Sequence, residues 1–267
     1  MIYAKILADS INSSGDRLTT MEVQFHRFIL PEFNTHRVFS RNSSSSRAIP
    51  ISRQIDRIEK NPAFPVYWGM NKPGMQADIE LESCDVIHAN RTWKKASKSA
   101  IKYAKKLEKL GVHKQTTNRI LEPFMWHKVI VSSTEWDGFF EQRCSPLAQP
   151  EIRIAAEMMQ KAYNTSTPHF LLKGEYHLPY LTFQDLNFPN KDKIKMCVAR
   201  CARVSYDNHD GSFNQIKDLE LFNRLATAEP PHWSPMEHIA TPLTKKLSSE
   251  GNFSGFAQIR HNLNLVL

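Results

Sequence analysis

Three arginines, one histidine, one asparagine and five serines fall within the twelve residues 36–47, the part of this sequence richest in side chains suited to chemistry. A guanidinium presents a planar set of donors that matches a phosphate or a carboxylate. Serine hydroxyls and an asparagine amide add short, adaptable partners. If a helix begins at Pro50, the serines lie just before its N-terminus, where free N–H groups and the helix dipole favour an anion. The stretch therefore predicts a binding site for a phosphorylated small molecule, with a solvated Ser-rich loop as the other interpretation.

The spacing within residues 36–47 resembles the signature of the flavin-dependent thymidylate synthases, R-H-R-x-x-S-x-N-x-x-S-x-R. The positions that match are His36, Arg37, Ser40, Asn42, Ser45 and Arg47. Two positions depart from it, because Thr35 replaces the first arginine and Ser43 stands where the family usually has glutamate. Arg260 is a candidate to replace the charge that is missing at Thr35.

Four other stretches resemble elements of the same family, in a different order. They are Arg119 with Pro123, Arg143 with residues 148–153 (AQPEIR), residues 202–206 (ARVSY) and residues 232–238 (HWSPMEH). In the family the last two elements precede the arginine signature, whereas here they follow it. We therefore expect a circularly permuted or otherwise rearranged chain, which requires Ser234 to lie near Arg37, within a subunit or across an oligomer.

The resemblance implies roles for individual residues. Arg143 would be catalytic, because a fixed guanidinium stabilises an ionised uracil ring. The nucleotide dUMP would be bound by Ser43, Ser44, Ser45, Ser46, Arg47, Arg119 and Arg143. The flavin would be contacted by His36, Arg37, Asn42, Ser43, Ser132, Ser133, His232 and Ser234. No residue is expected to hold a metal.

The implied reaction is the reductive methylation of dUMP to dTMP, with FAD and NADPH as cofactors and methylenetetrahydrofolate as carbon donor. The family does without an enzymic nucleophile and is understood to place its active sites between the subunits of a homotetramer. Three alternatives stay open: a flavoenzyme that methylates or hydroxymethylates another pyrimidine nucleotide, a catalytically inactive relative, and a nucleic-acid-binding protein. The sequence has no clear NADPH-binding motif.

Composition favours a soluble protein with anionic partners. The net charge is +8 and the pI is about 9.3, but the lysines of residues 94–114 lack the interleaved aromatic residues of a nucleic-acid surface. No apolar run is long enough to cross a bilayer, and the N-terminus is too short and polar for a signal peptide. The four cysteines form no C-x-x-C pair, so free buried thiols and a cytoplasmic location are expected.

The predicted fold is mixed α+β, a thymidylate synthase-like central sheet, antiparallel or mixed, flanked by helices. It forms a single domain over residues 1–267, with a possible internal division near 165–192. Strands are expected at residues 1–9, 21–30 and 239–246, and helices at 51–60, 77–110, 118–126, 134–142, 148–163 and 217–226. Residues 129–131 are expected to form a short extended or helical junction.

Overall fold

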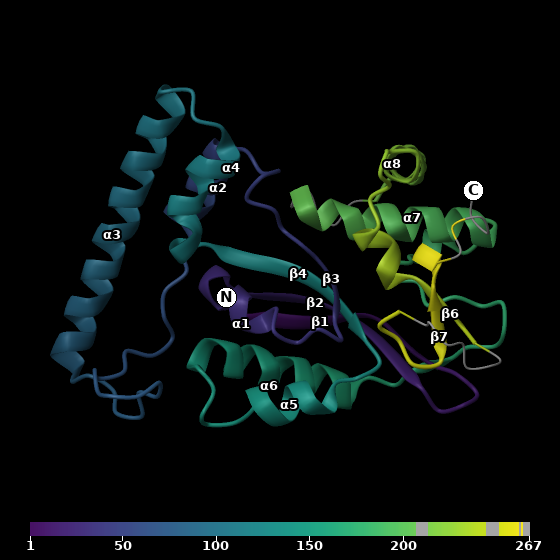
Figure 1. Ribbon diagram of the computed structural model, residues 1–267, viewed down its shortest axis with the longest axis horizontal. Coiled ribbons are helices and arrows are strands. Elements are labelled where there is room, and N and C mark those ends of the chain that lie inside the picture. The colour runs from purple at the N-terminus through teal and green to yellow at the C-terminus, as the bar shows by residue number, and fades with distance from the viewer. Residues whose placement is uncertain (207–212, 244–250, 262, 264–267) are drawn as a thin grey trace.

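A five-stranded sheet forms the centre of the molecule (Figure 1) in the computed structural model, which describes residues 1–206, 213–243, 251–261 and 263. Its order is β3-β4-β2-β1-β5. The strands are β1 (Tyr3–Ile11), β2 (Arg17–His26), β3 (Ser40–Ser43), β4 (Trp126–Ser133) and β5 (His169–Phe170). Only β5 pairs in parallel, with β1, and the other three pairings are antiparallel. The prediction of a mixed sheet in an α+β fold is confirmed.

Strand β4, which lies between β3 and β2, was not predicted as a full strand from the sequence, and the reason is its burial on both faces. Val129 and Val131 belong to one hydrophobic cluster, whereas Ile130 between them belongs to another. A strand that is apolar on both faces shows no alternation. The expected helix at 118–126 was therefore wrong in part: residues Asn118–Phe124 form a 3₁₀ helix (η2), and β4 begins at Trp126.

One face of the sheet is covered by α5 (Asp137–Arg143) and α6 (Pro150–Thr165), which lie below it in Figure 1. Helix α6 buries the apolar stripe predicted for it, namely Ile152, Ala155, Ala156 and Met159. Helix α5 begins three residues later than expected, because the backbone N–H of Glu135 donates to the hydroxyl of Ser133 at 2.9 Å and forms a turn there.

The opposite face is covered by segments from the C-terminal part of the chain. They are η3 (Phe183–Asp185), α7 (Asn190–Arg203), η4 (Val204–Tyr206), α8 (Gln215–Ala226), η5 (Ser234–His238), η6 (Ile259–His261) and the two-stranded sheet of β6 (Ala240–Pro242) and β7 (Phe256–Gln258). A buried ion-pair cluster joins three of these segments, because Arg200 of α7 contacts Asp185 at its carboxylate and Asp218 of α8 at 2.8 Å. The last residues of the expected strand 239–246 lie outside the described residues.

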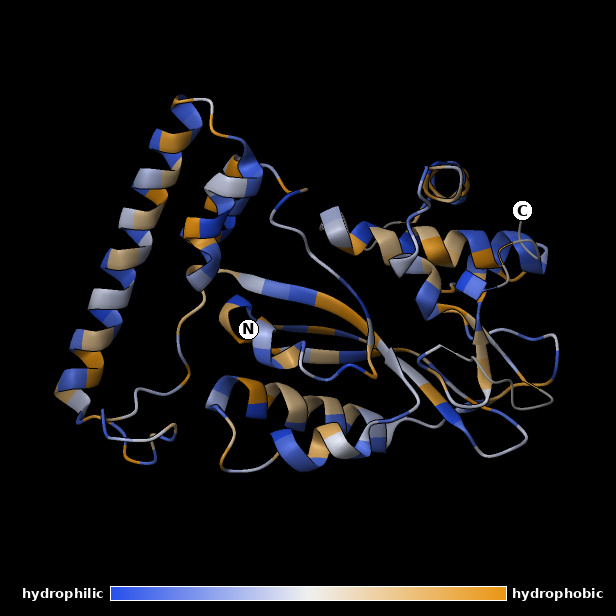
Figure 2. Ribbon diagram, in the orientation of Figure 1, coloured by the Kyte–Doolittle hydropathy of each residue, from blue (hydrophilic) through white to orange (hydrophobic). Residues whose placement is uncertain are grey.

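A helical arm projects to one side of the sheet (Figure 1). It contains α2 (Ile51–Lys60), α3 (Ser83–Lys109), α4 (Lys114–Thr117) and η2, and the chain enters it from β3 and leaves it from η2 into β4. The short helices η1 (Arg27–Ile29) and α1 (Leu30–Phe33) connect β2 to β3. The helix expected at 51–60 has the predicted bounds. Helix α3 begins six residues later than expected, since Glu80 still forms an extended bridge with Gly69. Hydrophilic residues recur along the whole of α3 (Figure 2).

Among the described residues, no helix is both long enough and apolar enough to span a bilayer. The four cysteines are free thiols, but the expectation that they are buried holds for two of them, because Cys84 is exposed and Cys144 is half-buried. Cys197 and Cys201 are buried in α7, and burial raises the pKa of both thiols above their ordinary range. Neither is placed to act as a nucleophile.

Candidate active site

Asn42 of β3 connects parts of the chain that are far apart in sequence. Its side-chain amide donates to the carbonyl oxygen of Cys201 at 2.6 Å, and its carbonyl oxygen accepts from the hydroxyls of Ser205 (3.2 Å) and Ser234 (3.3 Å). The backbone N–H of Ser45 donates to the carbonyl of Ser205 at 3.0 Å. Residues 36–47, 202–206 and 232–238 thus meet at one point. Ser234 thus lies beside β3, the strand that follows Arg37.

Arg143, the last residue of α5, reaches the loop that precedes β3. Its Nε donates to Nε2 of His36 at 2.9 Å, and its Nη2 donates to the hydroxyl of Thr35 at 3.3 Å. The carboxylate of Glu32 lies 3.6 Å from its Nη1. The predicted catalytic arginine and the predicted flavin contact His36 are therefore in direct contact, and Thr35 serves as a neutral partner of the arginine.

His36 is held in its neutral form. Burial, the guanidinium of Arg143 and the guanidinium of Arg41 lower the pKa of His36 to about 4. A neutral imidazole can accept from Arg143 through Nε2, whereas an imidazolium would repel it. Arg41 is anchored by the carbonyl oxygens of Phe33 and His36 at 3.3 and 3.4 Å. The site is therefore strongly cationic and suited to an anion. Arg41 was missed in the sequence because it fills a variable position of the signature.

Glu122 of η2 holds a second set of cationic side chains, and it was not among the residues predicted from the sequence. Its carboxylate oxygen Oε1 accepts from Arg119 at 2.8 Å, from Arg27 at 3.1 Å and from the hydroxyl of Ser46 at 2.6 Å. The spacing of three residues between Arg119 and Glu122 is typical of a helical ion pair and was the available signal. Arg119 is exposed, so the glutamate positions it without burying it.

Ser44 and Ser46 have partners inside the protein. The hydroxyl of Ser44 lies 3.1 Å from Nδ1 of His127, and the Oγ of Ser46 bonds to Glu122. Arg27 also donates to Nδ1 of His127, at 2.9 Å. Burial and the guanidinium of Arg27 hold the pKa of His127 well below its ordinary value, so this imidazole accepts hydrogen bonds. Both serines are buried, and these contacts favour a structural role for their side chains.

The remaining residues of the predicted site lie at the surface. Arg37, Arg47, His232 and Ser234 are exposed, and Ser43 and Ser45 are half-buried. The backbone N–H of Arg47 donates to the hydroxyl of Ser45 at 3.2 Å, which fixes the turn between them. Exposed guanidinium and hydroxyl groups form a donor set that fits the phosphates of a nucleotide or of a dinucleotide such as FAD. In the described part of the chain, no cluster of His, Cys, Asp and Glu could hold a metal ion.

Ser132 belongs to a buried network that crosses the sheet. Its hydroxyl lies 2.6 Å from that of Thr20 and 2.8 Å from Nδ1 of His238. Thr20 in turn lies 2.7 Å from Nε2 of His177, whose Nδ1 lies 2.8 Å from the hydroxyl of Ser10. The neighbouring Ser133, also buried, donates to the carbonyl of Glu135 at 3.0 Å. Both predicted flavin-contacting hydroxyls on β4 are therefore used within the protein.

This network predicts a loss of stability in mild acid. Burial lowers the pKa of both His177 and His238 to about 3, whereas histidine in an unfolded chain titrates near 6.5. As the pH falls from about 6.5 towards 3, the unfolded chain binds a proton at each of these two histidines that the folded protein does not bind, so the free energy of unfolding falls. His36 and His127, whose pKa values are also lowered, add to the same fall. Above pH 6.5 these histidines contribute no pH dependence. Urea unfolding at pH 7.5, 6, 5 and 4 measures the slope.

The matched variants are His177→Asn and His88→Asn. The first removes one titrating group, so the free energy of unfolding should vary less steeply with pH than in the wild type. His88 is exposed on α3, and its replacement should leave the slope unchanged. An unchanged slope in His177→Asn would contradict the assignment of the acid sensitivity to this network.

Comparison with known proteins identifies the family. The profile described as thymidylate synthase complementing protein matches residues 18–169, which is more than half of the chain. The chain therefore belongs to this family. The match includes the signature at 36–47, Arg119, Arg143 and residues 148–153, and it ends before residues 202–206 and 232–238. The predicted family is confirmed.

Solved structures of similar shape include two with bound nucleotides. The UMP/dUMP methylase PolB from Streptomyces cacaoi, bound to 5-Br dUMP, has a TM-score of 0.49 at 14% identity, covering 61% of this chain and 90% of that one. Thymidylate synthase X (ThyX) from Helicobacter pylori, with FAD and dUMP, has a TM-score of 0.39 at 14% identity, covering 55% and 67%. No curated protein matches the chain in sequence.

Proposed function

We propose that the protein is a flavin-dependent thymidylate synthase that methylates dUMP to dTMP. Methylenetetrahydrofolate would supply the carbon, and FAD reduced by NADPH would supply the hydride. The observation that carries the proposal is the meeting of residues 36–47, 202–206 and 232–238 at Asn42, in a chain that belongs to the family. Elements that are dispersed in the sequence form one cationic, hydroxyl-rich surface.

Arg143 acts on the pyrimidine in this proposal. Its guanidinium is fixed by His36 and Thr35, so it can stabilise negative charge on the uracil ring without reorganising during the reaction. Because His36 is neutral at pH 7, it accepts a hydrogen bond from Arg143 without placing a second positive charge beside it. Arg47 and Arg119 bind the phosphate of dUMP, and Ser43 and Ser45 donate hydrogen bonds to the phosphate or the sugar.

The flavin is bound on the adjoining surface in this proposal. Arg37, His232 and Ser234 contact it together with His36. Asn42, predicted as a further contact, is buried and uses its amide within the protein, so in this proposal it holds the three segments together. When bound, the reduced flavin supplies the hydride that completes the methyl group. The protein's own task is to align the two ligands and to exclude water. In this proposal four buried hydroxyls stabilise the loop and strand that carry the site and do not contact the ligands, because they form hydrogen bonds inside the protein. They belong to Ser44, Ser46, Ser132 and Ser133.

A second candidate function is the methylation or hydroxymethylation of another pyrimidine nucleotide. The departures from the family signature favour it, because Thr35 and Ser43 lie next to the proposed nucleotide site. Thr35 contacts Arg143 directly, so the loss of an arginine there changes the charge that faces the substrate. Ser43 replaces a longer, acidic side chain and leaves room for a different sugar or base.

The family resemblance extends the proposal to the assembly and its location. We propose a homotetramer whose active sites lie between subunits, in the cytoplasm, with small-molecule nucleotides rather than nucleic acid as partners. The exposure of Arg37, Arg47 and His232 supports it, since a neighbouring subunit can approach these side chains.

The proposal predicts a flavin absorption spectrum that responds to dUMP. Purified protein supplied with FAD should show the flavin bands, and added dUMP should shift them because both ligands share one site. The measurement is a titration with dUMP, repeated with UMP and dCMP. A shift only with another nucleotide would favour the second candidate function. Absence of flavin binding would contradict the proposal.

A further inference from the structure

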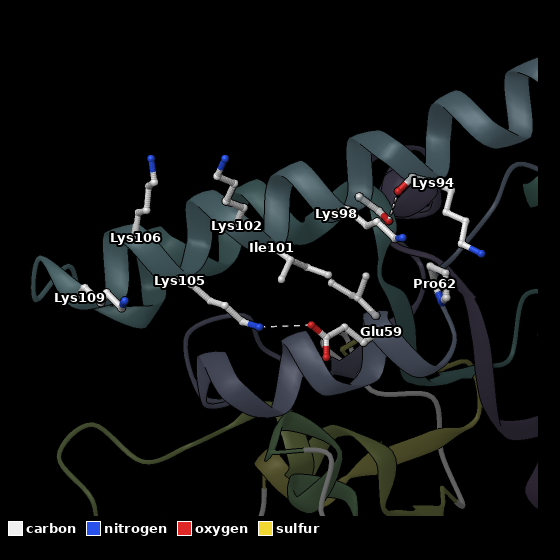
Figure 3. Close-up of a pocket in the computed structure, with 11 residues that line it drawn as sticks. Glu59, Pro62, Lys94, Lys98, Ile101, Lys102, Lys105, Lys106 and Lys109 are labelled. Atoms are coloured by element: carbon white, nitrogen blue, oxygen red, sulfur yellow. Dashed lines mark hydrogen bonds and ion pairs between the residues drawn. The ribbon is translucent and has the colours of Figure 1, made fainter.

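A groove rimmed by lysines runs between α2 and α3 of the helical arm (Figure 3). It has a volume of about 670 Å³. Its apolar floor includes Ile58, Pro62 and Ile101. Six lysines of α3 also line the groove, which is called the lysine groove from here on: Lys94, Lys98, Lys102, Lys105, Lys106 and Lys109. The one carboxylate among the lining residues is Glu59, which lies 3.3 Å from Lys105.

The composition of the lysine groove selects among anionic partners. A single-stranded nucleic acid would need aromatic side chains on which its bases could stack, and the residues that line the groove include none. An apolar floor with cationic rims instead fits a peptide segment that combines apolar side chains with carboxylates. The ligand class that matches is therefore an acidic, amphipathic segment of protein.

This chain carries such a segment at the other end of the same arm. Residues 75–87, the acidic segment, contain Asp78, Glu80, Glu82 and Asp85 and neither lysine nor arginine. They also contain large apolar side chains that face solvent: Met75 is fully exposed, and Ile79 and Ile87 are more than half exposed. Apolar side chains gathered on an exposed segment indicate an interaction surface.

Within one chain the acidic segment cannot reach the far end of the lysine groove. Asp85 and Lys105 lie on the same helix, α3, and are separated by twenty residues, which corresponds to about 30 Å along the axis. A rigid helix keeps them apart. Two copies of the arm packed antiparallel around a two-fold axis would bring each acidic segment to the other copy's lysine groove, and both contacts would form at once.

We propose that the lysine groove binds the acidic segment of a second copy of this chain, so that two helical arms pair antiparallel. In Figure 1 α3 lies at the edge of the molecule with α2 on its inner side, which leaves its outer side open. The pairing would also cover Tyr103 and Leu110, which are 56% and 79% exposed. This interface does not depend on the proposed catalytic function, since no residue of the proposed active site takes part.

A charge-swap experiment tests the pairing. The groove is made acidic by Lys94→Glu/Lys98→Glu/Lys105→Glu/Lys109→Glu, which leaves two lysines against five carboxylates. The segment is made basic by Glu80→Lys/Glu82→Lys/Asp85→Lys, which leaves one carboxylate against three lysines. All seven of these residues are exposed. Each variant alone should associate about 100-fold more weakly than the wild type at this interface, because like charges then face each other in both symmetric contacts. Sedimentation velocity should show a halved particle mass for each variant.

Mixing the two variants supplies the decisive result. An acidic groove then meets a basic segment, and a basic groove meets an acidic one, so the mixture should recover the wild-type mass. The matched control is Lys161→Glu/Lys191→Glu, which reverses two exposed lysines on α6 and α7 and should keep the wild-type mass. Variants that retain the wild-type mass, or a mixture that fails to recover it, would overturn the proposal.

Carbodiimide cross-linking identifies the contact directly. Wild-type chains labelled with ¹⁴N and ¹⁵N are mixed, dissociated and reassociated, and then cross-linked between carboxylates and amines. Mixed-isotope cross-links should join residues 78–85 to lysines 94–109. The ion pair of Glu59 and Lys105 should give cross-links within one chain only. Mixed-isotope cross-links from the lysine groove to any other acidic region, or cross-links to a nucleic acid that copurifies, would assign the groove to a different partner and overturn the pairing.

Discussion

Replacement of Arg143 by alanine is expected to lower kcat for nucleotide methylation by about 10²- to 10³-fold, the usual cost of removing a donor that stabilises transition-state charge. The guanidinium is fixed by His36 at 2.9 Å and Thr35 at 3.3 Å, so a lysine at this position cannot reproduce both contacts. Arg143→Lys should therefore recover only a small part of the activity. The measurement is the initial rate of dTMP formation as a function of dUMP concentration.

The control for Arg143 is Arg224→Ala on α8, which removes an exposed arginine from outside the proposed site. It should retain the wild-type kcat and KM. A variant at Arg143 that raises KM and leaves kcat unchanged would show that the arginine contributes only to binding. Full activity in Arg143→Ala would remove this residue from the chemistry.

Residues of the candidate site could be predicted from the sequence where both the type of side chain and its spacing match a known pattern. The arginine signature, Arg143 and residues 232–238 are recognisable because their side-chain types recur at fixed intervals, and the structure brings Asn42, Ser205 and Ser234 together. Burial could not be read from spacing. Ser44 and Ser46 look like their neighbours Ser43 and Ser45 in the sequence, and only the fold shows that they face Glu122 and His127.

Of the fold, the amphipathic helices were the most predictable part. Helix α2 has the predicted bounds and α6 buries the predicted stripe, because one apolar face against one polar face gives a strong periodicity. Strand β4 gives no such signal since it is buried on both sides. The start of α3 depended on a tertiary contact, the bridge between Gly69 and Glu80, which local sequence does not encode.

The second large effect is expected at the buried ion-pair cluster of α7 and α8. Asp218 accepts from Arg200 at 2.8 Å and from Arg203 at 2.6 Å, and the side chains of Asp218 and Arg200 are fully buried. Asp218→Asn removes the charge and leaves the guanidinium of Arg200 without one of its two carboxylates. Breaking a buried pair costs about 3 to 5 kcal/mol of unfolding free energy, which for a chain of this size lowers Tm by about 10 °C.

Calorimetry of Asp218→Asn beside Asp56→Asn measures this effect. Asp56 is exposed on α2, and its replacement should change the unfolding free energy by no more than about 0.5 kcal/mol. If Asp218→Asn also unfolds within about 1 kcal/mol of the wild type, the cluster does not require this carboxylate's charge.

The position of β3 in the sheet also affects the risk of aggregation while the chain folds. This strand is an edge of the main sheet, and η5 and η4 pack against it. An uncovered edge offers unpaired backbone groups to other chains and promotes aggregation. The family-matched part of the chain, residues 18–169, contains this edge together with the apolar side of Ile130, but the segments that cover both come later in the sequence. During synthesis β3 therefore stays uncovered until residues 204–206 and 234–238, which pack against it, have been made.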